Sequence, residues 1–504
     1  MSSDCPSPPT TSRAENSSGE DSGPPSPEGG VSLHIGATDV PLTTVRFSDH
    51  TAGHIASHID EPVQTLNDDL YKFQEEPDYK DRHGRTALLY FTQHTAPILE
   101  SIKGLIEAEY SPNDACPEKC CTPLINITKR ADLNIEEHKK AIKYLTGEGG
   151  AHVNLNNSRY GSVLNKTCYD GNLAMVKFLI QECGADPNFM SEGLFGSALQ
   201  AACLSKANKE GIYEMISYLC NEAGAKINAN SGFFGTALNI TCLLQPERPW
   251  MLIYDHIKGD STIPDQMGRL PIHFAAVFSY RRFQVICQTS RLKVPLNSKD
   301  KTGRTVLHWA AQSGEAGTVE AILSSRAVKV DQPDYDGWTA LCWAARGLTS
   351  GAKFEGKAAQ SQAKIIDHLL KHGADKTVSV RGDAGQSWTP LQIAIFHNSG
   401  EHVIAALTAS IPEEETSKSL TDSSFRQTGY VHGKLACICC RSPIIGTAWS
   451  CQSCMDFKLC FKCYFVGEKI HPRHLGGDLH EFKKSDSVFG EVLDKEVLKT
   501  WMKR

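Results

Sequence analysis

A dense group of cysteines and histidines lies near the C-terminus of this 504-residue chain. Three Cys-x2-Cys pairs span positions 437–463, and histidines follow at 471, 474 and 480. Thiolate and imidazole ligands at such spacing suit a tetrahedral, redox-inert ion, so the expected metal is zinc. Three pairs and two histidines make eight ligands, enough for two zinc ions. The candidate ligands are Cys437, Cys440, Cys451, Cys454, Cys460, Cys463, His471, His474 and His480.

The residues between the cysteines indicate the type of site. The run 443–449 precedes the second Cys pair, 457–459 leads into the third, and 480–482 closes the unit. These segments resemble the ZZ-type zinc finger of dystrophin-like, sequestosome-like and mind-bomb-like proteins.

The resemblance implies a cross-braced pair of zinc sites. One zinc would be held by Cys437, Cys440, Cys460 and Cys463, and the other by Cys451, Cys454 and two histidines. His480 fits the closing position of the family pattern. Spacing alone leaves its partner open between His471 and His474, and we prefer His474. Cys439 is expected not to be a ligand, because its neighbour Cys440 completes the turn.

Two positions of the finger depart from the family pattern. Ala448 stands where the family has arginine, and Lys458 stands where it has an acidic residue. The resemblance implies that acidic side chains hold the positive amine in fingers that capture protein N-termini or histone tails, and a lysine repels that amine. Asp456 is an alternative acidic group. These departures favour a protein-docking finger.

Interpreting the cysteines as metal ligands depends on the compartment. Residues 1–30 hold no apolar stretch for a secretory signal, and no run of about 18 apolar residues exists that would span a membrane. In a reducing compartment clustered cysteines are metal ligands more often than disulfides. The net charge of −6 argues against direct nucleic-acid binding. The chain is expected to be intracellular, in the cytoplasm, the nucleus or both.

Upstream of the cysteines, the chain repeats a phrase of glycine, any residue, threonine or serine, any residue and leucine. Aligned at the threonine, nine copies stand at 86, 122, 162, 197, 236, 270, 305, 339 and 389. A period of about 33–35 residues with loop insertions is typical of a solenoid of helix pairs. The Thr or Ser would cap a first helix, alanine pairs such as Ala310-Ala311 would let helices approach closely, and glycines such as Gly184 would end second helices.

This pattern resembles the ankyrin repeat family, whose repeats read D-x-x-G-x-T-P-L-H-x-A-A and G-A-D-x-N. The family histidine survives at His273 and His308, and the other repeats hold Leu89, Ile125, Asn165, Gln200, Asn239, Cys342 and Gln392 there. Asn and Gln can still make local hydrogen bonds, whereas apolar residues cannot. The first two repeats are therefore degenerate, and an insertion at 347–362 is expected to protrude as a loop. The phrase 196–202 resembles repeats common in filamentous fungi.

The predicted fold is mainly α, an ankyrin solenoid with a small two-zinc finger. The expected parts are a largely disordered tail at 1–76, the solenoid at 77–410, a linker at 411–430, the finger at 431–484 and a short helix at 485–504. The first 30 residues of the tail are rich in Pro, Ser and Gly. Trp309, Trp338, Trp343 and Trp388 fall at repeat positions and are expected to pack. Cys116, Cys120 and Cys121 lack a histidine or second pair nearby, which favours a loop of thiols.

No nucleophile, base and orienting residue can be combined from this sequence. No catalytic or small-molecule-binding residue is therefore predicted, and the chain is expected not to be an enzyme. An ankyrin stack presents a concave face and a row of hairpin tips, which suits binding of other proteins. The predicted function is a scaffold or adaptor, with transcriptional coregulation as one setting. The alternative is a substrate-selecting part of a ubiquitin-pathway complex, because mind-bomb-like ligases combine the same two modules.

Overall fold

The computed structural model describes most of the repeat region and parts of the cysteine-rich region. It describes residues 79–81, 84–94, 99–116, 121–129, 135–156, 161–191, 195–232, 234–243, 247–289, 295–347, 357–382, 387–397, 399–409, 431–437, 443–445, 448–451, 458–460, 463 and 482–485. The chain divides into two units between Glu76 and Pro77, and every described residue belongs to the second unit. The expected tail, the expected linker and residues 486–504 of the expected C-terminal helix lie outside the described residues.

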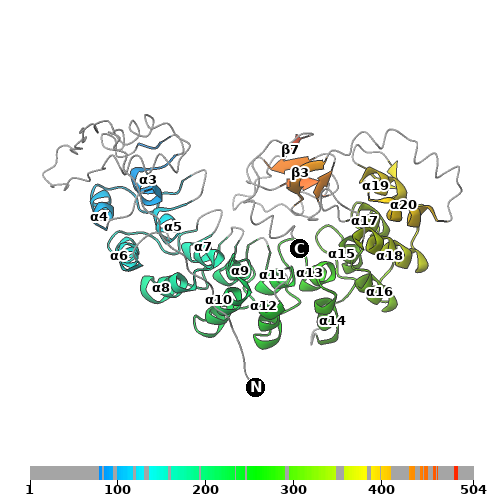
Figure 1. Ribbon diagram of the computed structural model, residues 1–504, viewed down its shortest axis with the longest axis horizontal. Coiled ribbons are helices and arrows are strands. Elements are labelled where there is room, and N and C mark those ends of the chain that lie inside the picture. Colours follow the sequence, from blue (N-terminus) through cyan, green and yellow to red (C-terminus); the bar gives the residue numbers. More distant parts are fainter. Residues whose placement is uncertain are drawn as a thin grey trace, which may run out of the picture. The chain divides into compact units, whose positions relative to one another are not determined.

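Nine helix pairs follow one another in the part of the repeat region that the structure describes (Figure 1). The first helices are α3 (Ala87–His94), α5 (Pro123–Thr128), α7 (Val163–Asp170), α9 (Ala198–Cys203), α11 (Ala237–Leu243), α13 (Pro271–Phe278), α15 (Val306–Ser313), α17 (Ala340–Arg346) and α19 (Pro390–Phe396). The second helices are α4 (Leu99–Glu107), α6 (Ile135–Thr146), α8 (Leu173–Cys183), α10 (Lys209–Asn221), α12 (Glu247–Met251), α14 (Tyr280–Thr289), α16 (Ala316–Ser324), α18 (Lys357–Lys371) and α20 (Glu401–Thr408). A π-helical segment, η1 (Leu252–His256), continues α12.

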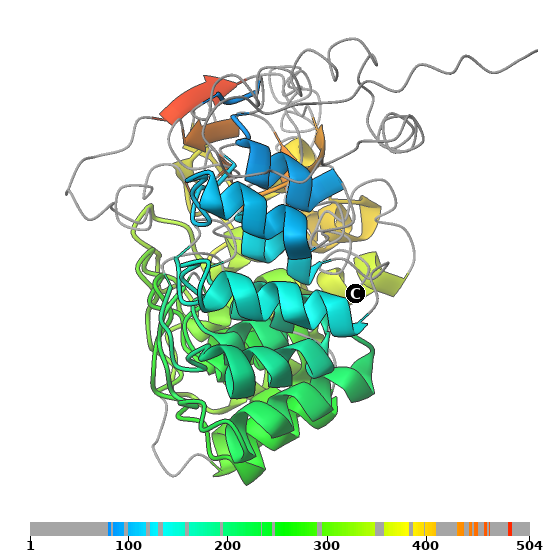
Figure 2. The ribbon, with the colours of Figure 1, turned by 90° about the vertical axis from the view of Figure 1, so that its left-hand side faces the viewer.

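Each first helix packs on the first helix of the next repeat and on the second helix of its own repeat. The blue-to-green helices at the start of the stack run nearly parallel, one below another (Figure 2). Repeats that contact mainly their neighbours form a solenoid, so the mainly helical fold predicted from the sequence is confirmed.

Local hydrogen bonds explain where the first helices begin. Each of the nine starts one residue after the aligned threonine position. Ser162 Oγ accepts a hydrogen bond from Asn165 N at 3.2 Å, which satisfies an N–H that the helix leaves open. Leu270 has no hydroxyl, and here the Leu270 amide donates to His273 Nδ1 at 2.9 Å instead. Gly184 adopts a left-handed φ of 72° and ends α8, as predicted.

Small side chains let the first helices approach each other. Ala310 and Ala311 of α15 are 0% exposed, as are Ala344 and Ala345 of α17. The four tryptophans at repeat positions are also buried, which confirms their packing role. Their exposed fractions are 1% for Trp309, 0% for Trp338, 1% for Trp343 and 2% for Trp388.

A buried aspartate and arginine link a hairpin to the helix that follows it. Arg304 Nε donates to Asp300 Oδ2 at 3.2 Å, and Trp309 Nε1 donates to the same oxygen at 3.0 Å. The Arg304 guanidinium also lies over the Trp309 ring, 4.0 Å from its centroid. Burial acts to raise the pKa of Asp300, but Arg304 and the Thr302 hydroxyl more than offset it, so the pKa is lowered. The carboxylate therefore stays charged inside the fold.

The family histidine joins one repeat to the next at His308. Thr305 N donates to His308 Nδ1 at 3.0 Å, and His308 Nε2 lies 3.2 Å from the carbonyl oxygen of Trp338. A neutral ring that accepts at Nδ1 donates from Nε2, which matches both contacts. Burial lowers the pKa of His308 to about 4, so the ring is neutral near pH 7.

Four repeats carry an Asn or Gln at the position of this histidine. In three of them the amide side chain makes a hydrogen bond that the histidine makes in its own repeat. Gln200 Nε2 donates to Ser231 O at 3.0 Å, and Asn165 Nδ2 donates to Phe195 O at 3.0 Å. In the last repeat the Thr389 amide donates to the side chain of Gln392 at 2.8 Å. At Asn239 the expectation was wrong, because neither amide atom has a hydrogen-bond partner among the described residues.

The loop expected at 347–362 needs a correction, because α18 already begins at Lys357. The side chain of Gln362 is 0% exposed, and its Nε2 donates to Ala311 O at 2.9 Å and to Ala344 O at 2.7 Å. The low apolar content of this segment suggested a loop. The buried glutamine, which satisfies carbonyls of two first helices, explains why its second part is helical. Residues 348–356 lie outside the described residues.

Short antiparallel strands make up the described remainder. β1 (Val380–Arg381) pairs with β2 (Ser387–Trp388) between α18 and α19. In the cysteine-rich region, β3 (Val431–Ala436) pairs with β4 (Pro443–Ile445). β5 (Ala448–Cys451) lies between β6 (Lys458–Cys460) and β7 (Phe482–Ser485). Ser485, the first residue of the expected C-terminal helix, therefore ends a strand.

Candidate metal centre

The cysteines stand at the ends of the short strands. Cys437 directly follows β3, and Cys460 is the last residue of β6. β3 and β6 contact each other, which brings these two strand ends together. Cys463 lies three residues after Cys460, the spacing at which a tight turn directs both thiols to one metal.

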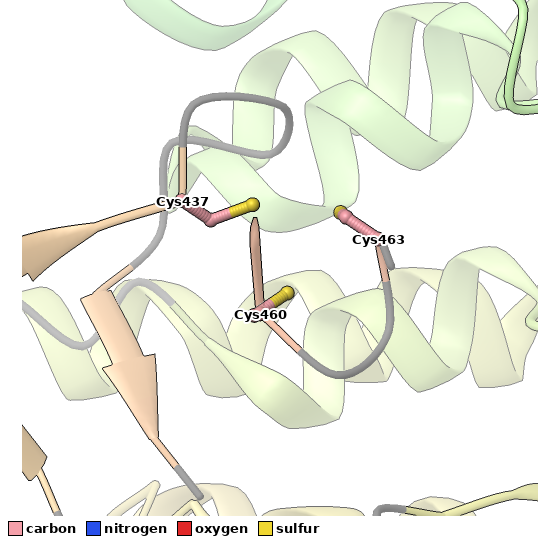
Figure 3. Close-up of side chains that lie close together, drawn as sticks. All are labelled: Cys437, Cys460 and Cys463. Carbon is pink, nitrogen blue, oxygen red and sulfur yellow. The ribbon is translucent and has the colours of Figure 1, made fainter. Parts of the chain in front are cut away.

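Three thiols converge at this place (Figure 3). The ligand atoms of Cys437, Cys460 and Cys463 all lie within 4.8 Å of one another. Zinc–sulfur bonds of about 2.3 Å in a tetrahedron put sulfurs about 3.8 Å apart, so the cluster has the dimensions of a zinc site. The three residues are 1%, 0% and 3% exposed. A buried set of soft thiol donors fits zinc, for which it would supply three thiolate ligands.

Cys451 is not part of this cluster. It ends β5, whose register pairs Ala448 with Cys460, so Cys451 lies three residues farther along the strand. At about 3.4 Å per residue this is about 10 Å, too far to share a zinc with Cys460. On the opposite edge of β5, the register pairs Cys451 with Phe482 of β7. The remaining predicted ligands lie outside the described residues: Cys440, Cys454, His474 and His480, with the alternative His471.

One group of thiol and cationic side chains was not predicted as a site. Lys129 Nζ lies 3.0 Å from Cys121 Sγ, beside a cavity that Arg85 and Cys116 also line. The sequence showed the cysteines but not the cations, because Arg85 comes from the preceding repeat. The available signal in the sequence was Lys129, which stands eight residues after Cys121, directly beyond the six-residue helix α5. It could have indicated a cation near the thiol.

Comparison with known proteins finds relatives of the repeat region. The chain is 30% identical over 252 residues to the ankyrin repeat domain-containing protein SAT10 of Stachybotrys chartarum, which covers 48% of this chain and 12% of that protein. It is 31% identical over 124 residues to the ANK repeat-containing protein nipk-1 of Caenorhabditis elegans, which covers 23% of this chain and 19% of that protein. The chain thus matches a minor part of the length of these relatives.

A third relative contradicts the prediction that the chain is not an enzyme. The chain is 26% identical over 274 residues to palmitoyltransferase AKR1 of Lachancea kluyveri, a match over 52% of this chain and 33% of that protein. The chain is therefore similar to a protein named for an enzyme activity, and the absence of catalysis does not follow from these motifs. None of the helices that the structure describes is both long and apolar enough to cross a membrane.

Family models match both modules of the chain. The ankyrin-repeat model matches residues 131–231 and 272–354, and the model of the ZZ-type zinc finger matches residues 431–475. The first match falls on the helix pairs, and the second contains the cluster of Cys437, Cys460 and Cys463. Zinc binding is implied by the family of the finger and fits these thiols. The chain therefore contains ankyrin repeats and a ZZ-type zinc finger near its C-terminus.

Proposed function

We propose that this chain is an adaptor that binds partner proteins through the hairpins of its ankyrin stack and through its zinc finger. The interior of the stack is filled by apolar side chains of both helix layers, and these are buried. Among the described residues, the exposed large apolar side chains are Met190 and Tyr335, at 45% and 57%. Both stand in segments between a second helix and the next first helix.

The exposure of Tyr335 carries this proposal. Its amide donates to Thr302 O of the preceding hairpin at 3.1 Å, so the backbone that presents the ring is held in place. Tyrosine is enriched at binding hot spots because it offers a large contact area at low entropic cost. A rigid hairpin tip with an exposed aromatic ring therefore suits a protein partner.

Affinity capture from cells of the source organism tests the proposal. The bait is the full chain, unmutated or with Tyr335→Ala. The control is Tyr213→Ala, which removes a half-buried tyrosine from α10, a second helix. Partners recovered with the unmutated chain and the control, and lost with Tyr335→Ala, would support hairpin binding. Equal recovery with all three proteins would contradict it, once circular dichroism shows equal helix content.

The finger is proposed to hold two zinc ions with the eight ligands expected from the sequence. One set is Cys437, Cys440, Cys460 and Cys463, and the other is Cys451, Cys454, His474 and His480. The three-thiol cluster and the separation of Cys451 from it support two sets. The strand register supports His480, because β7 begins at Phe482 opposite Cys451, two residues after His480 in the sequence. The finger would therefore extend over 431–484.

The setting of the adaptor is proposed to be intracellular, with transcriptional coregulation as the first candidate. The alternative, selection of substrates for a ubiquitin ligase, draws on the shared modules of mind-bomb-like ligases. Those ligases also need a RING finger, and no second eight-ligand cluster exists in this sequence. The capture experiment separates the two settings by whether the hairpin-dependent partners are chromatin-bound proteins or ubiquitin-ligase subunits.

A further inference from the structure

A cavity of about 160 Å³ lies between the first two helix pairs. Its lining includes two cysteines, Cys116 and Cys121, and two cations, Arg85 and Lys129. The cysteines are 4% and 6% exposed, so they reach outward mainly through this cavity. Neither module of the chain accounts for a group of this composition.

The two cysteines are close enough to be joined. Cys116 N donates to Cys121 O at 3.1 Å. With standard bond lengths this contact limits the distance between their Cα atoms to about 7 Å. Disulfides form at Cα separations of about 4.4–6.8 Å, and this upper limit lies at the edge of that range. Both residues carry thiols in the structure.

Cationic side chains share this cavity with Cys121. Lys129 Nζ lies 3.0 Å from Cys121 Sγ, and the Arg85 side chain lines the same cavity while its Nε donates to Asp81 Oδ2 at 2.5 Å. Reactive cysteines occur in electropositive, accessible surroundings, because positive charge favours attack by sulfur and stabilises the leaving oxygen. Cys287 of α14, an exposed thiol that does not line this cavity, provides the reference for comparison.

We propose that Cys121 and Cys116 form a peroxide-reactive thiol pair. The sulfur of Cys121 attacks one oxygen of a hydroperoxide, and the O–O bond breaks. The thiol proton goes to the leaving oxygen, which departs as water or an alcohol, and Cys121 becomes a sulfenic acid. The sulfur of Cys116 then attacks that of Cys121. The S–O bond breaks, the hydroxyl group leaves as water with the Cys116 proton, and a disulfide remains that a thiol reductant reverses.

The test uses the full, zinc-loaded chain and hydrogen peroxide as the probe. After short exposure, remaining thiols are blocked with N-ethylmaleimide and peptides are mapped without reduction. The expected product is a Cys116–Cys121 disulfide with the loss of two hydrogens. Cys116→Ser should leave a sulfenic acid on Cys121 that dimedone traps. The same peptide map gives the extent of oxidation of the finger cysteines and of Cys287, which serve as reference thiols.

Lysine variants test the role of the cation. Lys129→Met should slow the reaction of Cys121 severalfold, and Lys129→Arg should retain the rate. Since Lys129 is exposed, neither variant should change the helix content, and circular dichroism checks this. The proposal would be overturned if Cys121 reacts no faster than Cys287, if Cys121 pairs with Cys120 instead of Cys116, or if Lys129→Met reacts at the unmutated rate.

Discussion

Replacing His308 by glutamine should make the solenoid less sensitive to acid. His308 is 1% exposed and neutral, and burial lowers its pKa to about 4. Asp334 and Asp300 act to raise that pKa and Arg304 to lower it, but burial has the largest effect. In the unfolded chain the histidine has its ordinary pKa of about 6.5.

The direction and size of the change in folding stability with pH follow from the difference between the folded and unfolded pKa of His308. Because the folded pKa is depressed, the unfolded chain takes up the proton first as the pH falls below about 6.5. The stability that the neutral histidine contributes is full above pH 6.5 and is lost as the pH falls toward 4. Between pH 7.5 and pH 5 the loss is about 2 kcal/mol.

Glutamine is the matched replacement because the chain already uses it at this position. Gln392 accepts the Thr389 amide at 2.8 Å, as His308 Nδ1 accepts that of Thr305 at 3.0 Å. His308→Gln should therefore keep the capping bond and remove the titration. Urea unfolding at pH 7.5 and pH 5, followed by far-ultraviolet circular dichroism, should show a loss about 2 kcal/mol smaller in the variant. An equal loss in both proteins would refute the reasoning.

Four further substitutions have defined outcomes. Leu307→Ala should lower the free energy of unfolding by about 2–5 kcal/mol, because Leu307 is 1% exposed in α15, which packs on α13 and α17. Leu88→Ala should cost less in urea titrations, since α3 contacts one neighbouring first helix, α5; equal losses would argue against a weaker first repeat. Trp309→Phe removes a donor from buried Asp300 and should cost about 1–3 kcal/mol by the same titration, whereas an unchanged midpoint would show that this bond does not stabilise the fold. Lys458→Asp should strengthen binding of peptides with a free N-terminal Arg, Lys or Ala in fluorescence titrations with the full chain; micromolar binding by the unmutated chain, abolished by N-terminal acetylation, would contradict the role given to Lys458.

Features set by near neighbours were predictable from the sequence. The Ser162 cap depends on Asn165, three residues away, and Gly184 ends its own helix. Cys460 and Cys463 stand three residues apart, at the spacing of one metal-binding turn. The family resemblance placed Cys437 with them, and in the structure the three thiols lie within 4.8 Å of one another.

Features set by distant partners were not predictable. Gln362 is held by the carbonyl of Ala311, 51 residues away, so its local sequence looked like a loop. Arg304 is a charged residue, a type usually exposed, and its buried guanidinium also lies 5.0 Å from the ring centroid of Trp343, a residue of the next repeat. The cavity beside Cys121 needs two repeats to be stacked before it exists.

The zinc content of the full chain tests the two-site finger most directly. Native mass spectrometry of the unmutated protein should show two zinc ions per chain. Cys437→Ser and Cys451→Ser fall in different proposed sets, so each variant should hold no more than one zinc. Chelation of the zinc should reduce the order of the finger, because metal binding supplies its folding energy. One zinc or none in the unmutated chain, or two zinc ions in either variant, would contradict the cross-braced arrangement.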